Sequence, residues 1–147
     1  MTRSAYPAVA AVLIVACGSP STGGGITVTD ARVLDPLGSQ RSAFYATIAN
    51  SGPEADTLLG LSTVSASAAT LHITTHSDGI TRMSSTHAVV IPGRGETRLE
   101  PGGFHGMLEG LPRAFGVGDT VQVTLRLARA GSLVVRALVT DPIHARH

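Results

Sequence analysis

The chain has 147 residues, which is enough for one domain with a modest hydrophobic core. Hydrophobic residues make up 43% of it and charged residues 14%, and the 17 glycines and 8 prolines favour short strands joined by turns. The 11 basic residues, all of them arginine, nearly balance 10 acidic residues, and no basic stripe with interleaved aromatic residues is present. Nucleic-acid binding is therefore unsupported, and no strongly charged partner of either sign is implied.

Residues 1–17, MTRSAYPAVAAVLIVAC, have the pattern of a secretory signal peptide. One positive charge, Arg3, precedes an apolar run that is too short to span a bilayer. The run ends in Ile14-Val15-Ala16-Cys17, which resembles the lipobox of bacterial lipoproteins, in which the cysteine carries the lipid. We therefore expect a lipid on Cys17, a flexible spacer over 18–25 and an extracytoplasmic location at the membrane. The alternative is an incidental cysteine in an uncleaved leader.

From residue 26 onward, apolar and polar residues alternate over short stretches that are bounded by turn-forming residues. This alternation is typical of β-strands, and nothing carries a helical period long enough to predict a helix. The pattern predicts an all-β domain over 26–141, an antiparallel β-sandwich or Greek-key barrel, followed by a polar tail over 142–147. The predicted strands cover 26–34, 42–50, 56–63, 68–75, 80–83, 87–92, 96–101, 104–111, 120–128 and 133–140.

Four side chains in the middle of the chain form a candidate metal site: His72, Met83, His105 and Met107. Apart from the initiator Met1, the chain has no methionines besides the two in this set. Residues two apart in a strand point to the same face, so His105 and Met107 should project together while their neighbours Phe104 and Leu108 face the core. The other two donors lie on either side of a predicted turn at Asp78-Gly79, so they can fold back towards the same place.

The chemistry of these four groups favours Cu(I). Thioether sulfur is a soft, neutral ligand that suits Cu(I), whereas Zn(II) prefers thiolate, imidazole or carboxylate. A blue-copper electron-transfer site normally needs a cysteine thiolate, and the only cysteine, Cys17, lies in the predicted lipobox. Residue type alone leaves a second interpretation open, in which the methionines fill the core and the histidines are structural or exposed.

The spacing of these residues resembles the H-x10-M-x21-H-x-M motif of the PCu(A)C family of extracytoplasmic copper chaperones. Further segments are similar to the family's patterns: FYATIANSG, DTLLGLSTVSASAATLH, IPGRGETRLEPGGFHGMLEGL and GDTVQVTLRL. The resemblance implies a cupredoxin-like β-sandwich with Cu(I) bound at an exposed end by His72, Met83, His105 and Met107. It also implies delivery of copper to an acceptor cuproprotein such as cytochrome c oxidase or its assembly factors. Arg94 and Glu109 depart from the family's usual residues, at positions that hold no ligand.

Four histidines remain. Some members of the family carry a His- or Met-rich tail with a Cu(II) site, and His144 and His147 are a thin version of it. His76 is expected to be an exposed turn histidine, with a supporting role beside the site as the alternative, and His87 has no assigned role. We expect a binding protein and not an enzyme. The competing functions are a copper buffer or resistance protein with the same ligands, and a metal-free secreted β-sandwich that recognises another protein.

Overall fold

The computed structural model describes residues 21–23, 25–111 and 116–143. Regular structure in these segments consists of strands, which confirms the all-β prediction. The signal segment, Cys17 and the tail histidines His144 and His147 lie outside the described residues. The strands are β1 (Ser21–Gly23), β2 (Ile26–Leu34), β3 (Arg41–Asn50), β4 (Asp56–Ser62), β5 (Ala68–Ser77), β6 (Ile80–Thr86), β7 (Val89–Ile91), β8 (Gly95–Leu99), β9 (Phe104–Glu109), β10 (Thr120–Leu127) and β11 (Gly131–Thr140).

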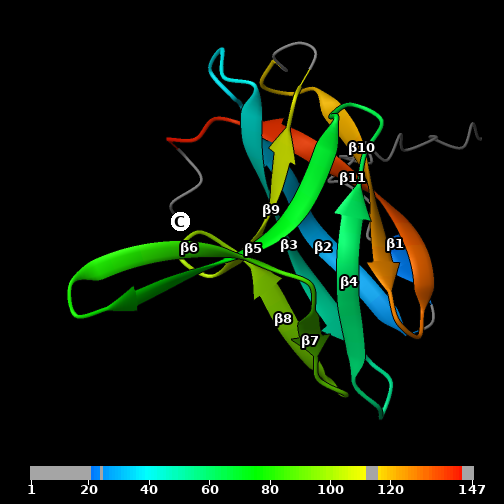
Figure 1. Cartoon of the computed structure of the whole chain (residues 1–147). Coiled ribbons are helices and arrows are strands. Elements are labelled where there is room, and N and C mark those ends of the chain that lie inside the picture. The colour runs from blue at the N-terminus through cyan, green and yellow to red at the C-terminus, as the bar shows by residue number, and fades with distance from the viewer. Residues whose placement is uncertain (1–20, 24, 112–115, 144–147) are drawn as a thin grey trace, which may run out of the picture.

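The strands form one continuous sheet in the order β6-β5-β9-β8-β3-β2-β11-β10-β4-β7, with β1 paired to β2 and a further pairing between β9 and β3. The sheet folds over on itself, so that β4 lies against β5 and β7 lies against β8 (Figure 1). Most neighbours are antiparallel, as predicted, but β2 pairs with β11 and β8 with β9 in parallel. Alternation along one strand carries no information about the direction of its neighbour, so the sequence could not reveal these two pairs.

Strand β1 lies inside the segment that was predicted to be a spacer, and its backbone pairs with the start of β2. The segment is rich in Ser, Thr and Gly and has no apolar alternation. β1 pairs with residues 26–28 of β2, whereas β11 pairs only with residues 32–34 of that strand. Backbone hydrogen bonds alone can hold such a short strand, so no side-chain pattern predicts it. No helix long and apolar enough to cross a bilayer was found among the described residues.

The core is made of aliphatic side chains that alternate along each strand, with Phe44 as its only fully buried aromatic residue in the part of the chain described. Strand β10 shows the pattern well, because Val121, Val123 and Leu125 are buried while the residues between them are more exposed. Each fully buried aliphatic side chain contributes about 1.5–3 kcal/mol to folding before the entropy cost. The domain is therefore held by one apolar layer between the two halves of the sheet.

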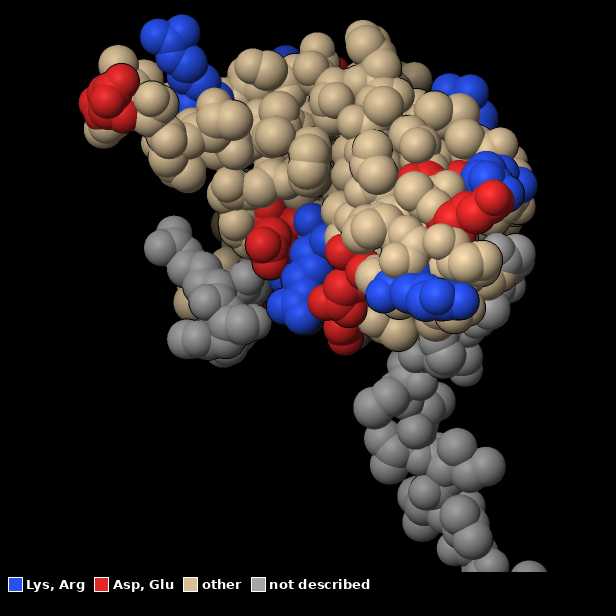
Figure 2. Space-filling view, turned by 90° about the horizontal axis from the view of Figure 1, so that it is seen from below, with Lys and Arg blue, Asp and Glu red and all other residues tan. Residues whose placement is uncertain are grey.

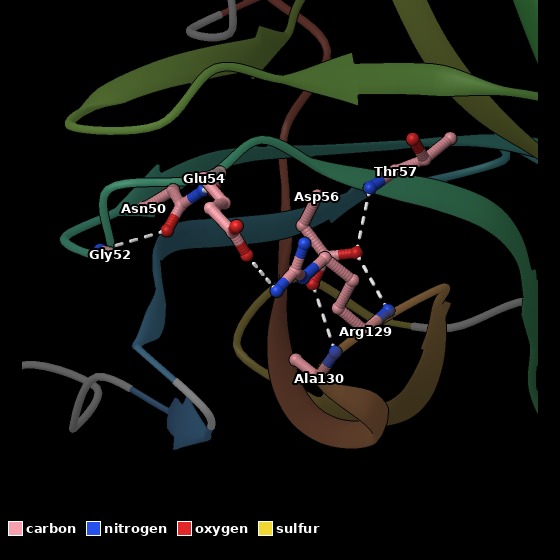
Figure 3. A network of polar contacts seen from close by, with 7 residues as sticks. All are labelled: Asn50, Gly52, Glu54, Asp56, Thr57, Arg129 and Ala130. Carbon is pink, nitrogen blue, oxygen red and sulfur yellow. Dashed lines mark hydrogen bonds and ion pairs between the residues drawn. The ribbon is translucent and has the colours of Figure 1, made fainter.

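A polar network joins the start of β4 to the turn between β10 and β11 (Figure 3). Asp56 is buried, and its carboxylate accepts hydrogen bonds from the backbone N–H groups of Thr57, Arg129 and Ala130 at 2.7, 2.9 and 2.9 Å. The Arg129 guanidinium also forms an ion pair with Glu54. Burial alone would raise the pKa of Asp56, but the three hydrogen bonds and the charge of Arg129 outweigh it and lower that pKa.

The β5–β6 hairpin projects from the body of the domain (Figure 1). Its two-residue turn, Asp78-Gly79, has φ angles of 52° and 73°, as a type I′ hairpin turn requires. Residues 80–85 of β6 are all exposed, and β6 forms one edge of the sheet. Pairing with β5, and not burial in the core, therefore holds β6 in place.

Candidate metal centre

Two of the predicted donors face each other across neighbouring strands. In the β5–β9 pair, His72 lies opposite His105 and Thr70 lies opposite Met107. Leu71, between the two β5 residues, is buried in the core, so its neighbours point to the outer face of the sheet. The prediction that His105 and Met107 share a face is confirmed by the register.

The glycine between His105 and Met107 sits on the core side. A Cβ atom placed on Gly106 would lie 3.0 Å from a methyl carbon of Leu61 and 3.1 Å from the Cβ of Phe44. Leu108 is fully buried and Phe104 packs against the core, as predicted. The absence of a side chain at Gly106 thus lets β9 lie close to the core while it presents its donors outward.

Met83 reaches the same place from β6. It lies opposite Thr74, two positions beyond His72 on the outer face of β5. Its side chain extends across β5, so that its Sδ lies 3.2 Å from Nε2 of His105 on β9. Met83 is 55% exposed, whereas His105 is only 5% exposed. The three strands β6, β5 and β9 therefore contribute to one cluster with a buried and an exposed side.

The contact between His105 and Met83 is not an ordinary hydrogen bond. Nδ1 of His105 lies 3.1 Å from the carbonyl oxygen of Gly103, which can only accept, so Nδ1 carries the proton. In a neutral imidazole the other nitrogen, Nε2, then presents a lone pair. A thioether sulfur presents lone pairs as well, so two electron-pair donors face each other at 3.2 Å.

His72 lies beside His105 with the ring centroids 5.8 Å apart and the ring planes at 25°. Its Nε2 is 2.8 Å from the hydroxyl oxygen of Thr70 on the same strand. Its Nδ1 is buried and has no hydrogen-bond partner. A buried nitrogen without a partner is costly, so this atom is a second candidate ligand in the cluster.

Tyr45 covers the other side of His105. The two ring centroids are 6.4 Å apart with a tilt of 56°, and the guanidinium of Arg32 lies 5.4 Å above the tyrosine ring. Burial raises the pKa of Tyr45, and the nearby charge of Arg32 opposes this only in part. A neutral, largely buried aromatic ring therefore lies next to the His105 imidazole.

The remaining predicted residues are placed as follows. Met107 is half-buried on the same face, between Thr70 on β5 and Ala43 on β3, and the described structure shows no hydrogen bond to its sulfur. His76 is exposed near the end of β5, and its Nδ1 lies 2.8 Å from the hydroxyl of Thr81. His87 is exposed between β6 and β7. Across residues 21–23, 25–111 and 116–143, no group of three or more His, Cys, Asp or Glu side chains is placed to hold a metal ion.

The sequence analysis did not predict three groups that contact the two histidines. They are the Thr70 hydroxyl, the Gly103 carbonyl and the Tyr45 ring. Thr70 could have been found, because it lies two residues before His72 in a predicted strand and so shares its face. The other two contacts depend on the turn before β9 and on the pairing of β3 with β9, which no local pattern reveals.

Comparison with known proteins places this domain in a family. Residues 26–139 match the family model "LpqE-like", described as "Putative lipoprotein LpqE-like". The chain belongs to the LpqE-like family. A relative of similar sequence is "Putative lipoprotein Lxx21020" of Leifsonia xyli subsp. xyli (strain CTCB07), which is 30% identical over 118 residues, covering 80% of this chain and 70% of that protein.

Solved structures share the fold of this LpqE-like domain. The copper-bound PCuAC domain from PmoF2 matches with a TM-score of 0.73 and 24% identity, over 85% of this chain and 100% of that one. The apo-DR1885 protein of Deinococcus radiodurans matches with a TM-score of 0.64 and 33% identity, over 99% of both chains. Its Cu(I) form matches with a TM-score of 0.63 and 36% identity, over 79% and 78% of the two chains. The resemblance to the PCu(A)C family is thereby confirmed.

Proposed function

We propose that this LpqE-like protein is a copper chaperone that carries Cu(I) on the outer face of β5, β6 and β9, with His72, Met83, His105 and Met107 as ligands. The observation that carries the proposal is the 3.2 Å approach of the Met83 sulfur to Nε2 of His105, whose other nitrogen is already held by Gly103. Two lone pairs at this distance repel each other unless a cation lies between them or at their side.

The chemistry of the donors selects the cation. Imidazole and thioether are neutral, so bound Cu(I) would leave only a single positive charge in a half-buried place. A divalent ion would leave twice that charge. Zn(II) would find two imidazoles but neither thiolate nor carboxylate, and Mg(II) would lack the oxygen ligands that it prefers. The unpartnered Nδ1 of His72 gives a further donor that gains a partner when a metal binds.

The exposure of the donors suits a carrier and not an enzyme or a permanent cofactor site. His105 is buried, while Met83 is more than half exposed on the edge strand. An acceptor protein can approach Met83 and replace it first, before the buried imidazole is displaced. The copper-bound and Cu(I) structures of proteins with this fold support copper as the cargo.

The family also supports a location outside the cytoplasm, since both the LpqE-like family and the relative from Leifsonia xyli are described as putative lipoproteins. In the proposed organisation, residues 1–17 are the signal peptide, Cys17 carries the lipid, 18–25 link the anchor to the domain, and 26–141 bind copper. The acceptor would be an extracytoplasmic copper protein such as cytochrome c oxidase or one of its assembly factors.

A Cu(I) titration against a chromophoric competitor tests the ligand set. The chain from residue 18 onward should bind one equivalent, and the Met83→Leu, Met107→Leu double variant should lose tight binding because leucine keeps the bulk and removes the sulfur. His87→Asn, which changes an exposed histidine outside the cluster, is the matched control. Unchanged binding by the double variant would refute this site.

A transfer assay separates a chaperone from a copper buffer. Loaded protein is mixed with the apo copper domain of an oxidase, and the copper is followed by size separation. A chaperone should transfer faster than copper dissociates into a competing chelator, because the acceptor displaces Met83 directly. Transfer no faster than that dissociation rate would favour a buffer.

A further inference from the structure

The environment of His72 shows which of its two nitrogens is available for a metal. Nε2 is 2.8 Å from the Thr70 hydroxyl, and Nδ1 is buried with no partner. If Nδ1 carried the proton, the buried group without a partner would be the N–H of Nδ1. If Nε2 carries the proton, its N–H donates to Thr70, and the group without a partner is the lone pair of Nδ1. Buried N–H groups without acceptors are rarer in proteins than acceptors without donors, so the second state is favoured.

The geometry of the ring places this lone pair on the side of Met83, whereas Met107 lies opposite Thr70. The two nitrogens of an imidazole point away from each other, so Nδ1 is turned away from Thr70. The next residue of β5 on that face in this direction is Thr74, which is the cross-strand partner of Met83. The Met83 sulfur is the atom that approaches Nε2 of His105.

We infer that Thr70 is a positioning residue whose hydroxyl accepts the Nε2–H of His72, so that His72 binds copper through Nδ1 while His105 binds through Nε2. The inference rests on the proposed function, which it refines. In each histidine the nitrogen that does not bind is held by an oxygen, Thr70 Oγ1 or the Gly103 carbonyl. Such partners fix the tautomer and ring orientation and make the other nitrogen a better donor.

Thr70 is exposed, so its substitution creates no cavity and should leave the fold intact. Thr70→Val removes the hydroxyl and keeps the shape, and Thr70→Ser restores a hydroxyl. Thr75→Val makes the same change on the same strand but on its opposite, exposed face, and serves as the matched control. We expect Thr70→Val to weaken Cu(I) binding by about tenfold or more, and Thr70→Ser and Thr75→Val to stay close to the parent.

Long-range proton–nitrogen NMR spectra of protein labelled with ¹⁵N test the tautomer directly, and Cu(I) is diamagnetic. The metal-free parent should show His72 protonated at Nε2, and Thr70→Val should shift His72 towards a mixture of tautomers. On addition of Cu(I), the ¹⁵N shift should change at Nδ1 of His72 and at Nε2 of His105. A metal-free parent with the proton on Nδ1, or a copper-induced shift at Nε2 of His72, would overturn the inference.

The two proposals fail in different ways. If the parent binds no Cu(I), the proposed function fails, and the inference about copper fails with it even if the metal-free tautomer is as expected. If the parent binds copper tightly through the cluster but Thr70→Val binds equally well, only the role of Thr70 is refuted.

Discussion

His105 is the residue at which the core, a loop and the cluster meet. Its ring is 5% exposed, its Nδ1 is held by Gly103, and Tyr45 packs against its far side. In the proposed site this fixed ring would make His105 the anchor, and the more exposed Met83 would be the ligand that can move away.

Gly106 beside His105 gives a prediction at the residue scale. Gly106→Ala should lower the free energy of unfolding by about 1–3 kcal/mol, because its Cβ would press on Leu61 and Phe44 in a packed core. The same pressure should push β9 outward and weaken Cu(I) binding. Urea denaturation and the copper titration measure the two effects.

Gly60→Ala is the control for this change. A Cβ at Gly60 on β4 would meet only the side chain of Arg126, at an ordinary 3.5 Å. This variant should be as stable as the parent. If Gly106→Ala were equally stable, the close packing of β9 on the core would be contradicted.

Asp56 gives a prediction about pH. Its pKa is lowered in the folded protein, so the folded state binds fewer protons than the unfolded state at acid pH. The stability from this carboxylate is present above the ordinary value of about 3.9 and is lost as the pH falls through the lower folded value. Asp56→Asn should lower the free energy of unfolding at neutral pH by about 1–3 kcal/mol, because the amide NH₂ would face the N–H of Ala130 or Arg129.

The pH dependence separates this carboxylate from the others. The free energy of unfolding is measured by urea denaturation from pH 7 down to pH 3. It should fall less steeply with decreasing pH in Asp56→Asn than in the parent. Asp30→Asn, at an exposed position where a positive φ suits both residues, should keep the parent's decline. Identical slopes for the parent and Asp56→Asn would refute the role of Asp56.

At the scale of elements, strand β6 of the β5–β6 hairpin positions one proposed donor, Met83, without adding to the core. Residues 80–85 of β6 are all exposed, so the place of Met83 depends on the Asp78-Gly79 turn and on the pairing with β5. Gly79→Ala should strain a turn that needs φ near 73° by about 1–2 kcal/mol. Cu(I) binding should weaken and amide exchange in β6 should quicken, while global unfolding changes little.

The turn between β10 and β11 offers a matched control. Gly131 has φ of 79°, and a Cβ atom placed on it would meet no other atom within 4 Å, so Gly131→Ala carries the same backbone strain without a clash. Its strands contribute Val123, Leu125 and Val135 to the core. Global stability should therefore fall while Cu(I) binding stays unchanged, and the reverse pattern in the two variants would contradict the division between hairpin and core.

The strands could be predicted because alternation is local, and the common face of His105 and Met107 follows from the same alternation. The register of β5 on β9 could not be predicted, since it depends on how Leu71 and Leu108 pack in the shared core. The reach of Met83 across β5 depends in turn on that register. The local pattern does not show that the four side chains lie close together. That expectation came from their spacing, which resembles the motif of a known family.

At the scale of the whole molecule, 11 basic residues nearly balance 10 acidic residues. The formal net charge is +1, and Figure 2 shows basic and acidic side chains side by side on the face it presents. The described residues form the ion pairs Arg41–Glu109 and Arg98–Glu96, among others. No field of one sign is available there to attract or repel a cation. The affinity for Cu(I) should therefore come from the donors themselves.

The dependence of Cu(I) affinity on ionic strength tests whether the affinity comes from the donors and not from nearby charges. Between low salt and about 0.5 M of a non-coordinating salt, the Cu(I) dissociation constant should change by less than about twofold, because the ligands are neutral and distant charges are screened and balanced. The titration should use two competitors of different charge, so that any effect of salt on the competitor is recognised. A steep dependence with both would show that a charged group such as Arg32 takes part in binding.

The outer face of β5 and β9 carries the proposed donors and the inner face carries the core, so adjacent residues such as Leu71 and His72 have different roles. If the proposed ligands are correct, substitution of an exposed donor such as Met83 should change the ion that is held while the apolar core stays as it is. A descendant that exchanged its thioethers for carboxylates or thiols would keep the same scaffold while its cargo changed. Strand alternation thus makes metal preference and folding separately evolvable in this domain.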